Sequence, residues 1–349
     1  MTCRVLVTAA GGALSPLNIR LLKAGTRNAV WVGAVDVLNE AAGRYFADAF
    51  ATVPNGLDDG YVEAIEALVR DWSIDLVLPW SDEEALALAR VRGRIEAGGA
   101  TLACASLDAL EIMNDKAATF ERLQAAGLRV PQWEVARDPD DLDAAIGRIA
   151  EATGEFVVKP IVARGNRGTI VVRRDVTGAA PYQGSREIHM DAATFDAAHR
   201  TQIAVDLPVM VMERLAAPAY DIDVLARDGA VLRAMPRRRL NPAGVPFTGG
   251  VLEPSDALMT LAADVTAALE LSWLYDYDVM TAADGAPAII ELNPRPSGSI
   301  AAAILAGVPF YEDLISLMRS EPLPEVALPG PVALIPYTDC IAVPLKALP

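Results

Sequence analysis

The segment from Leu274 to Asn293, LYDYDVMTAADGAPAIIELN, constrains the fold most, because its pattern predicts a complete β-hairpin. Two largely apolar runs flank the dipeptide Asp284-Gly285. Asp-Gly is typical of a two-residue type I′ turn, in which both central residues need a positive φ. Such a turn places Ala283 opposite Ala286 and thereby fixes the pairing of every residue farther along the two strands.

This register predicts that Asp278 lies opposite Glu291 and that Asp276 lies opposite Asn293. Directly opposed residues share one face of a hairpin, with Cβ atoms about 5 Å apart, so four oxygen-bearing side chains gather in one patch. Like charges in this position destabilise a hairpin unless a cation compensates them. Magnesium takes few protein carboxylates and completes its coordination with water and phosphate oxygens. The apolar neighbours favour a metal site over the alternative, a solvated acidic face.

Basic groups upstream of the hairpin are candidates for binding the phosphates that accompany such a metal. Lys159 ends the strand EFVVKP, and Lys116 begins a helix, where the helix dipole favours anions. The turn ARGNRGT follows Lys159, and its glycines allow backbone N–H groups to close on phosphate oxygens. The turn contributes Arg164, Gly165, Arg167 and Gly168. Taken singly, each lysine could be solvated and the turn could be an ordinary hairpin turn.

Two further segments are candidates for ligand contacts. The strand VMVMERL ends in Glu213, Arg214 and Leu215, where the backbone could hydrogen-bond a purine ring. The segment PRRRL places three arginines in a row, Arg237 to Arg239. The row is either a solvated strand end or an anion-binding group, and we favour anion binding.

The order of the expected elements divides the chain. Residues 1–110 alternate strands and helices, which predicts a doubly wound parallel α/β domain. Within it, Ser81 and Glu84 fit a helix capping box, which accounts for the acidic residues between them. Farther on, residues 177–190 have the composition of an irregular loop, and the proline-rich tail 321–349 is expected to wrap the surface.

The composition excludes several classes of function. The chain has 349 residues, 52% of them hydrophobic, and a formal net charge of -16. A surface this acidic repels nucleic acid and anionic membranes, and no apolar run reaches the roughly 18 residues of a membrane span. Three scattered cysteines and two histidines form no disulfide, zinc or histidine-base pattern. Since no signal peptide is recognisable either, we expect a cytoplasmic protein.

Taken together, the motifs resemble those of the ATP-grasp ligases, especially members similar to the large subunit of carbamoyl-phosphate synthase. The matching segments, in family order, are NDKAATFERLQAAGLRVP, EFVVKP, GNRGT, VMERLAAPAYDIDVLA and YDYDVMTAADGAPAIIELNPRPSGS, which cover roughly residues 114–310. The resemblance implies an α+β ATP-grasp fold, with a small lobe at 111–210 and a central, metal-binding lobe at 211–320. The domain at 1–110 would be the one that precedes the grasp domain in this family.

The resemblance also assigns nucleotide contacts. ATP would lie between the two lobes, with Lys116 and Lys159 on its phosphates. The turn ARGNRGT, including Arg164, Gly165 and Gly168, would be a mobile loop that closes over them. Glu213 would receive the adenine amino group, and the backbone near Arg214 and Leu215 would complete adenine recognition.

Metal and catalytic roles follow from the same resemblance. One or two magnesium ions, which manganese could replace, would be held by Asp278, Glu291 and Asn293. Arg295 would steady the transferring phosphoryl group or the acyl phosphate. Together with Lys159 and Arg239, it makes up the set of candidate catalytic residues.

Two positions depart from the family pattern. Ala219 stands where relatives often carry a carboxylate that binds ribose, so Asp221 or Asp223 would have to take over that contact. Asp276 stands where some relatives have an arginine that contacts phosphate. Arg295 or the arginine row 237–239 would then supply this charge.

The activity implied by the resemblance is the ATP-dependent joining of a carboxylate to an amine through an acyl phosphate, with ADP released. The expected partners are small amino-acid-like acids and amines, not nucleic acids or membranes. A carbamoyl-phosphate-type reaction with bicarbonate or carbamate is one alternative. A regulatory protein that binds ATP without turnover is another. The chain has one grasp unit where the full synthase has two, although a homodimer could imitate the pair. A dehydrogenase is disfavoured, because TAAGGALSP lacks the full dinucleotide fingerprint.

Overall fold

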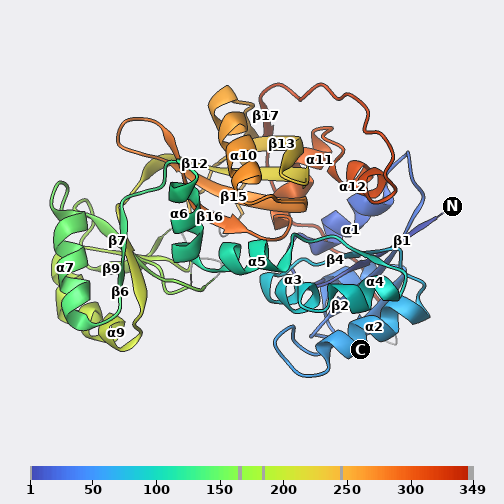
Figure 1. Ribbon diagram of the computed structural model, residues 1–349, viewed down its shortest axis with the longest axis horizontal. Coiled ribbons are helices and arrows are strands. Elements are labelled where there is room, and N and C mark those ends of the chain that lie inside the picture. Colours follow the sequence, from blue (N-terminus) through green and yellow to red (C-terminus); the bar gives the residue numbers. More distant parts are fainter. Residues whose placement is uncertain (1, 164–166, 183–184, 244–246, 345–349) are drawn as a thin grey trace.

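The computed structural model describes residues 2–163, 167–182, 185–243 and 247–344 and contains three β-sheets. In Figure 1 the N-terminal parallel sheet lies at the right, the first α+β lobe at the left and the second lobe between them. This is the predicted order of a parallel α/β domain followed by two α+β lobes. The fold class expected from the sequence is therefore confirmed.

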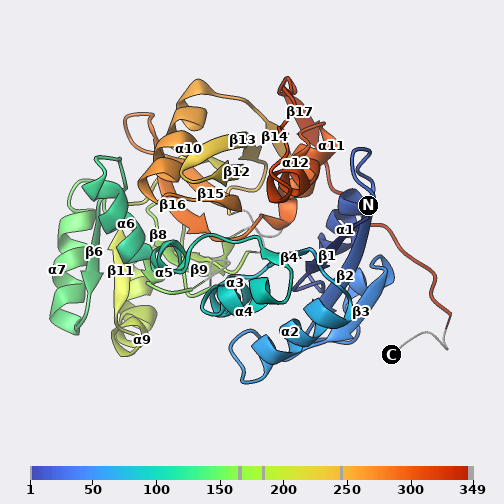
Figure 2. The same cartoon turned by 45° about the vertical axis from the view of Figure 1, so that its right-hand side comes forward.

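The N-terminal domain is a parallel sheet with the strand order β3-β2-β1-β4-β5. Its strands are β1 (Cys3–Val7), β2 (Val30–Asp36), β3 (Ala49–Thr52), β4 (Leu76–Leu78) and β5 (Thr101–Leu102). Its helices are α1 (Ser15–Lys23), α2 (Tyr61–Asp71), α3 (Asp82–Ala89) and α4 (Arg92–Ala97), with a short 3₁₀ helix at Ala42–Tyr45. The strand order changes direction between β1 and β4. The loops that follow these two strands face the rest of the molecule (Figure 2).

The first lobe is built on a six-stranded mixed sheet with the order β6-β11-β7-β8-β10-β9. Its strands are β6 (Trp133–Ala136), β7 (Phe156–Pro160), β8 (Ile170–Val172), β9 (Ala179–Pro181), β10 (Ile188–Met190) and β11 (Val209–Met212). Helices α5 (Leu107–Asn114) and α6 (Lys116–Ala125) lead into the lobe, and α7 (Pro139–Ala150) packs Leu142, Ile146 and Ile149 against the sheet. A short helical segment follows β10, made of α8 (Ala192–Thr194), a π-helical turn (Phe195–His199) and α9 (Arg200–Val205).

The stretch 177–190, predicted to be an irregular loop, instead contributes β9 and β10 to this sheet. Each strand is only three residues long, so the alternation of polar and apolar residues is too short to identify it from the sequence.

The second lobe is an antiparallel sheet with the order β16-β15-β12-β13-β14-β17. Its strands are β12 (Ala216–Arg227), β13 (Ala230–Arg239), β14 (Gly250–Leu252), β15 (Trp273–Thr281), β16 (Pro287–Asn293) and β17 (Val332–Leu334). Helix α10 (Asp256–Ala268) packs against it, and a 3₁₀ turn (Gly298–Ile300) leads to α11 (Ala301–Leu305) and α12 (Phe310–Met318). One apolar cluster joins α12 to α1 and β1, so this lobe and the N-terminal domain share a core.

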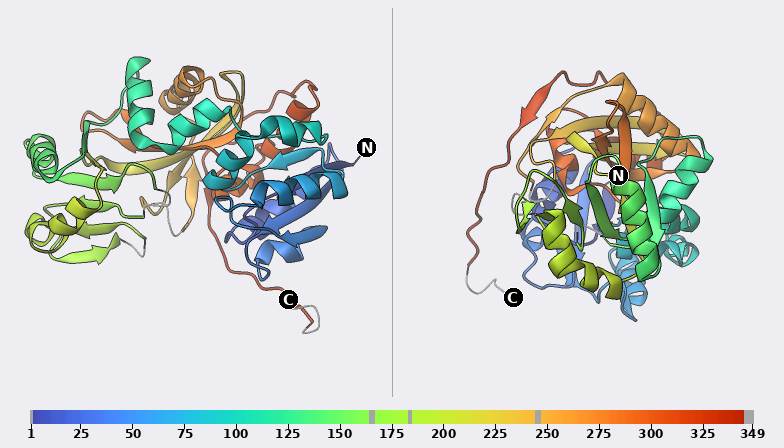
Figure 3. Two further views of the ribbon diagram at one scale, coloured as in Figure 1. Left: turned by 60° about the horizontal axis from the view of Figure 1, so that its bottom comes forward. Right: turned by 90° about the vertical axis from the view of Figure 1, so that its left-hand side faces the viewer.

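The proline-rich tail does more than wrap the surface. Its strand β17 pairs antiparallel with β14 and forms an edge of the central sheet. Residues 335–344 run along the outside of the molecule (Figure 3), where Ile335 and Tyr337 are exposed.

Within the described ranges, no single helix is both long and apolar enough to cross a membrane. Among the helices that the structure describes, one pair passes that test together, Gly298–Leu305 and Phe310–Met318, and its two segments are bent by 103° relative to each other.

The hairpin β15–β16 has the predicted pairing at the end away from its turn. Asp278 lies opposite Glu291, and Asp276 lies opposite Asn293. The structure therefore confirms that four oxygen-bearing side chains share one face of this hairpin, as the sequence predicted.

The turn of the hairpin, however, is not the predicted two-residue type I′ turn. Ala282 N donates to Ala286 O, which leaves a three-residue loop in which only Gly285 has a positive φ, of +86°. This loop alone would shift the register by one residue. A bulge at Ile290 restores it, because Val279 pairs with Ile289 while the next residue along, Asp278, pairs with Glu291.

Candidate functional site

A cleft lies between the sheet of the first lobe and the β15–β16 hairpin, and we call it the inter-sheet cleft. One wall is a row of apolar side chains across the first sheet, where Met212 pairs with Val157 and Val157 pairs with Val171. Met280 and Ile290 line it from the hairpin side. An apolar slot between two sheets suits a flat aromatic ring, whose faces need burial and whose edges need hydrogen bonds. The lining residues also include Lys116, Lys159, Glu213, Arg214, Leu215, Arg239, Asp278 and Glu291.

Lys159 points into this cleft from the end of β7. Its Nζ donates to the carbonyl oxygen of Ile290 at 3.1 Å, so the bulge that restores the hairpin register also supplies the partner of the buried ammonium. Burial lowers the pKa of Lys159 to about 8, and the neighbouring Lys116 adds to this effect. A buried lysine with such a pKa gains strongly from an anion placed beside it.

Lys116 is the first residue of α6, directly after Asp115, whose carboxylate caps the helix. Its Nζ lies 3.0 Å from Glu291 Oε1 and also donates to the carbonyl oxygen of Ala163. Both lysines predicted to contact phosphate therefore lie at the same end of the cleft, beside the acidic hairpin.

Glu213, Arg214 and Leu215 lie where β11 ends and the chain crosses between the lobes. The Glu213 carboxylate accepts a hydrogen bond from the Gln132 backbone N–H at 2.9 Å, and Arg214 pairs with Glu155 at 2.9 Å. These two side chains are thus held by the protein itself. A ring in the apolar slot would lie next to the backbone of this segment, as predicted for adenine.

The turn ARGNRGT lies only partly in the described ranges, since Arg164 and Gly165 fall outside them. Arg167 lines the inter-sheet cleft. Gly168 has a φ of +73°, and a Cβ there would come within 2.9 Å of the Pro160 side chain. Local geometry therefore requires glycine at position 168, whether or not this residue contacts a ligand.

A second pocket adjoins the cleft, and we call it the arginine pocket. Its arginines are Arg237, Arg239 and Arg295, and its acidic and amide residues are Asp221, Asp276, Asp278, Glu291, Asn293 and Asn241. Arg239, Asp278 and Glu291 line both cavities, so they stand at the junction between them. Leu14 reaches the arginine pocket from the N-terminal domain.

Each arginine of this pocket is paired with carboxylates. Arg237 contacts Asp221 at 2.6 Å, and Arg239 bridges Asp221 and Asp278. Arg295 lies 3.4 Å from Asp276 and also contacts Asn293 Oδ1 at 3.4 Å. The predicted anion-binding arginines are thus brought together, but each already has a negative partner in the protein.

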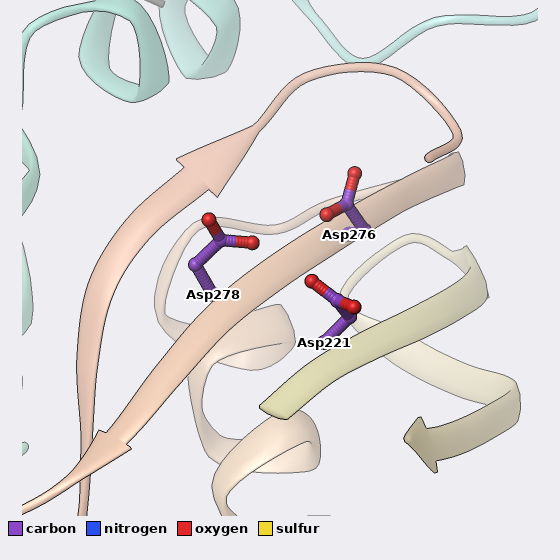
Figure 4. Close-up of side chains that lie close together, drawn as sticks. All are labelled: Asp221, Asp276 and Asp278. Carbon is purple, nitrogen blue, oxygen red and sulfur yellow. The ribbon is translucent and has the colours of Figure 1, made fainter. Parts of the chain in front are cut away.

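The oxygen atoms of Asp221, Asp276 and Asp278 come within 4.8 Å of one another (Figure 4). Burial raises the pKa of Asp278 to about 6 against the opposing effect of Arg239, and burial also raises the pKa of Asp276 well above its usual value. Buried carboxylates with raised pKa values indicate that the present cations compensate them incompletely. A hard divalent cation therefore fits the chemistry of these oxygen donors.

Among the clustered oxygens, the two of Asp221 are already occupied by Arg237 and Arg239, which hold its pKa below the usual range despite burial. Asp278 and Glu291 line both cavities, although they too pair with side-chain cations, Arg239 and Lys116. Asn293 lines the arginine pocket alone, where its amide donates to Asp276 at 3.1 Å, and the assignment of these three residues as metal ligands stays a prediction.

The two aspartates proposed to replace a ribose-binding carboxylate lie elsewhere. Asp221 lines the arginine pocket but not the inter-sheet cleft, and Asp223 is fully buried with its carboxylate on the Ser297 hydroxyl. Ala219 is itself buried. The placement of these residues lends no support to a ribose contact by Asp221.

Several residues of the site escaped the sequence analysis. Asp82, at the start of α3, lies 3.1 Å from Arg295 Nε and so reaches the site from the N-terminal domain. Ser81 caps α3 as predicted, since its hydroxyl accepts from Glu84 N, and the Glu84 carboxylate accepts from the Ser81 and Thr8 hydroxyls. The fit of Asp82 to this helix start gave no indication of its contact with Arg295. Tyr182 and His189, stacked with ring centroids 4.1 Å apart, line the far part of the cleft from the segment predicted to be a loop.

Two α+β lobes that enclose a cleft lined by lysines and an acidic hairpin are the arrangement that the ATP-grasp resemblance predicted. Residues 205–333 match the family model described as "ATP-grasp in the biosynthetic pathway with Ter operon", and residues 5–103 match "PylC-like, N-terminal domain". The chain therefore contains an ATP-grasp domain behind a PylC-like N-terminal domain, which confirms the resemblance seen in the sequence. No curated protein sequence matches the chain significantly.

Solved structures agree with this fold. The ADP complex of an N5-carboxyaminoimidazole ribonucleotide synthetase is similar with a TM-score of 0.69 and 18% identity, over 96% of this chain and 81% of that chain. An L-amino acid ligase from Bacillus licheniformis has a TM-score of 0.62 and 15% identity, over 91% and 74%. The biotin carboxylase domain of the Hydrogenobacter thermophilus 2-oxoglutarate carboxylase, crystallised with MgADP, ADP and bicarbonate, has a TM-score of 0.64 and 18% identity, over 92% and 70%.

Proposed function

We propose that the protein is an ATP-dependent ligase that activates a carboxylate as an acyl phosphate and passes the acyl group to an amine. The observation that carries this proposal is the junction of the two cavities. Arg239, Asp278 and Glu291 line both the inter-sheet cleft and the arginine pocket. A nucleotide in the first cavity and an acid in the second would therefore meet at charged residues.

In this proposal the adenine ring of ATP fills the apolar slot and its phosphates point toward Lys116 and Lys159. The buried ammonium of Lys159 favours this placement, because its hydrogen bond to the Ile290 carbonyl and its neighbouring carboxylates do not offset the effect of burial on its pKa, and an anion would. The backbone around Glu213 to Leu215 supplies hydrogen bonds to the edge of the ring.

Magnesium, held by Asp278, Glu291 and Asn293, would neutralise part of the charge on the triphosphate and supply no other chemistry. The chain's own residues orient the reactants. Arg295 is fixed by Asp82 and Asp276, so its guanidinium is placed beside the metal ligands without having to be ordered on binding.

The chemistry then runs in two steps. A carboxylate oxygen of the acid in the arginine pocket attacks the γ-phosphorus of ATP, and the bond to the β–γ bridging oxygen breaks to release ADP. The amine attacks the acyl carbon of the acyl phosphate, inorganic phosphate leaves, and the nitrogen loses a proton. Arg239 and Arg295 stabilise negative charge on the transferring phosphoryl group.

Two other candidates rest on specific observations. A bicarbonate acceptor is suggested by the bicarbonate in the biotin carboxylase structure, but the arginine pocket extends past the junction to Leu14 and Ser299, which favours a larger acid. A non-catalytic ATP-binding protein is suggested by the lack of a carboxylate at Ala219. We further propose small-molecule acids and amines as the partners, with a homodimer as the assembly to test.

The test is an isotope experiment on ADP formation. Amino acids are screened singly and in pairs for release of phosphate from ATP, and the active acid is then labelled with ¹⁸O in its carboxylate. Transfer of one ¹⁸O to inorganic phosphate is expected. ADP formation with unlabelled phosphate would refute acyl phosphate formation, while ¹⁸O transfer from bicarbonate alone would select the bicarbonate reaction. Tight ATP binding without any turnover would select the regulatory protein.

A further inference from the structure

Each of the two acidic metal ligands already carries a positive side chain from another part of the chain. Glu291 pairs with Lys116 at 3.0 Å, and Asp278 pairs with Arg239 at 2.6 Å. Lys116 comes from α6 at the edge of the first lobe, and Arg239 comes from the end of β13. Neither pairing follows from the hairpin itself, so two separate elements deliver cations to the same pair of carboxylates.

These pairings answer the electrostatic problem that the hairpin creates. Asp278 and Glu291 lie directly opposite each other with little exposure, where two like charges are unfavourable. The two cations stabilise this arrangement before any ligand arrives. A divalent ion at the same oxygens would repel them at close range, so the ion and the two side-chain cations cannot share the carboxylates favourably.

Both side-chain cations also line the inter-sheet cleft, where the phosphates are expected. When a polyphosphate is present, they have another negative partner within the same cavity. Lys116 additionally donates to the carbonyl oxygen of Ala163, the first residue of the turn ARGNRGT, so its position is tied to the start of that turn.

We propose that Lys116 and Arg239 are resident counter-ions of the metal site, which exclude free Mg²⁺ until phosphates draw them off Glu291 and Asp278. This inference rests on the proposed function for the location of the phosphates. It assigns each basic residue a metal-ligand carboxylate in the nucleotide-free protein and a phosphate in the complex. Arg239 has in addition a second carboxylate partner, Asp221, which is not one of the three proposed metal ligands. The metal is then taken up with the nucleotide and not before it.

The test measures binding of Mn²⁺, which replaces Mg²⁺ and is followed by the electron paramagnetic resonance signal of the unbound ion. Nucleotide-free wild-type protein is compared with Lys116→Met and Arg239→Gln. Removal of either counter-ion is expected to tighten Mn²⁺ binding by about tenfold or more, since one repulsive charge beside the ion is lost. Arg238→Gln is the matched control, because Arg238 neighbours Arg239 on β13 but pairs with Glu253 instead.

Two further arms locate the effect. Adding Glu291→Gln to Lys116→Met should abolish the gain in Mn²⁺ affinity, because it removes the carboxylate that was uncovered. ADP should tighten Mn²⁺ binding in the wild type and do so much less in Lys116→Met, since binding linkage is reciprocal. Circular dichroism checks that each variant is folded. If Arg239→Gln is unfolded, the Mn²⁺ affinity of Lys116→Met alone tests the inference.

Mn²⁺ affinity of folded Lys116→Met that is equal to or weaker than that of the wild type would overturn the inference. The proposed function fails differently, namely if wild-type protein binds no ADP with or without Mn²⁺. In that case a gain of Mn²⁺ affinity in the variants would still establish the counter-ions, while their release by phosphate would be refuted.

Discussion

Replacing Lys159 by methionine should make the nucleotide-free protein more stable and at the same time remove its response to nucleotide. The folded-state pKa of Lys159 is about 8, against the ordinary lysine value of 10.5. Burying the charged ammonium therefore lowers the free energy of unfolding. This loss is fully present below pH 8 and disappears above about pH 10.5. At pH 7 the difference corresponds to about 3 kcal/mol.

Methionine fills a similar volume without a charge, but it leaves the carbonyl oxygen of Ile290 without its donor, which costs about 1 kcal/mol. The net increase in the free energy of unfolding should be about 2 kcal/mol at pH 7. At pH 9.5 most of the lysine cost has gone, so the difference between variant and wild type should shrink by about 2 kcal/mol.

The assay is urea unfolding at both pH values, with and without ADP and magnesium. Bound nucleotide should raise the midpoint of the wild type and have little effect on Lys159→Met, because binding to the native state alone stabilises it. Lys23→Met is the control, since Lys23 is partly exposed and its ion pair with Asp48 should contribute under about 1 kcal/mol. A folded Lys159→Met that is less stable than the wild type at pH 7, or that keeps its full response to nucleotide, would refute this reasoning.

Three other substitutions test separate parts of the site. Asp221→Asn removes the negative partner of the fully buried Arg237 and of Arg239, and should cost about 3–5 kcal/mol in urea unfolding, whereas a loss under about 1 kcal/mol would contradict the pairing. Asp115→Ala removes the cap of α6 and should cost about 1 kcal/mol, and unchanged stability would show that the cap is dispensable. Glu291→Gln should weaken ADP binding in calorimetry only when magnesium is present, and an equal effect without magnesium would remove Glu291 from the metal site.

The sequence predicted the pairing of the acidic hairpin correctly for partly wrong reasons. Counting outward from the expected Asp284-Gly285 turn placed Asp278 opposite Glu291, and the structure has this pairing. The turn expected to fix this register has three residues instead of two, and the bulge at Ile290 compensates for the one-residue shift. A bulge follows from how the strand twists against its neighbours, and no residue in AIIELN marks it.

Contacts between distant segments were the other features that the sequence could not supply. The acidic residues after Ser81 fit a helix cap, so nothing local indicated that Asp82 reaches Arg295 in another domain. Likewise, Asp221 was a candidate for ribose because of its place in the chain, whereas β13 turns Arg237 and Arg239 onto its carboxylate. The residues of a motif can be identified from the sequence, but their partners depend on how the sheets pair.

The most direct test of the site is a crystal structure of the protein with ADP and Mn²⁺, in which anomalous scattering locates the ion. We expect an anomalous peak within coordination distance of Asp278, Glu291 and Asn293, with the diphosphate beside Lys116 and Lys159. A peak enclosed by Asp221 and Asp276 away from the nucleotide, or an ADP molecule outside the inter-sheet cleft, would contradict it.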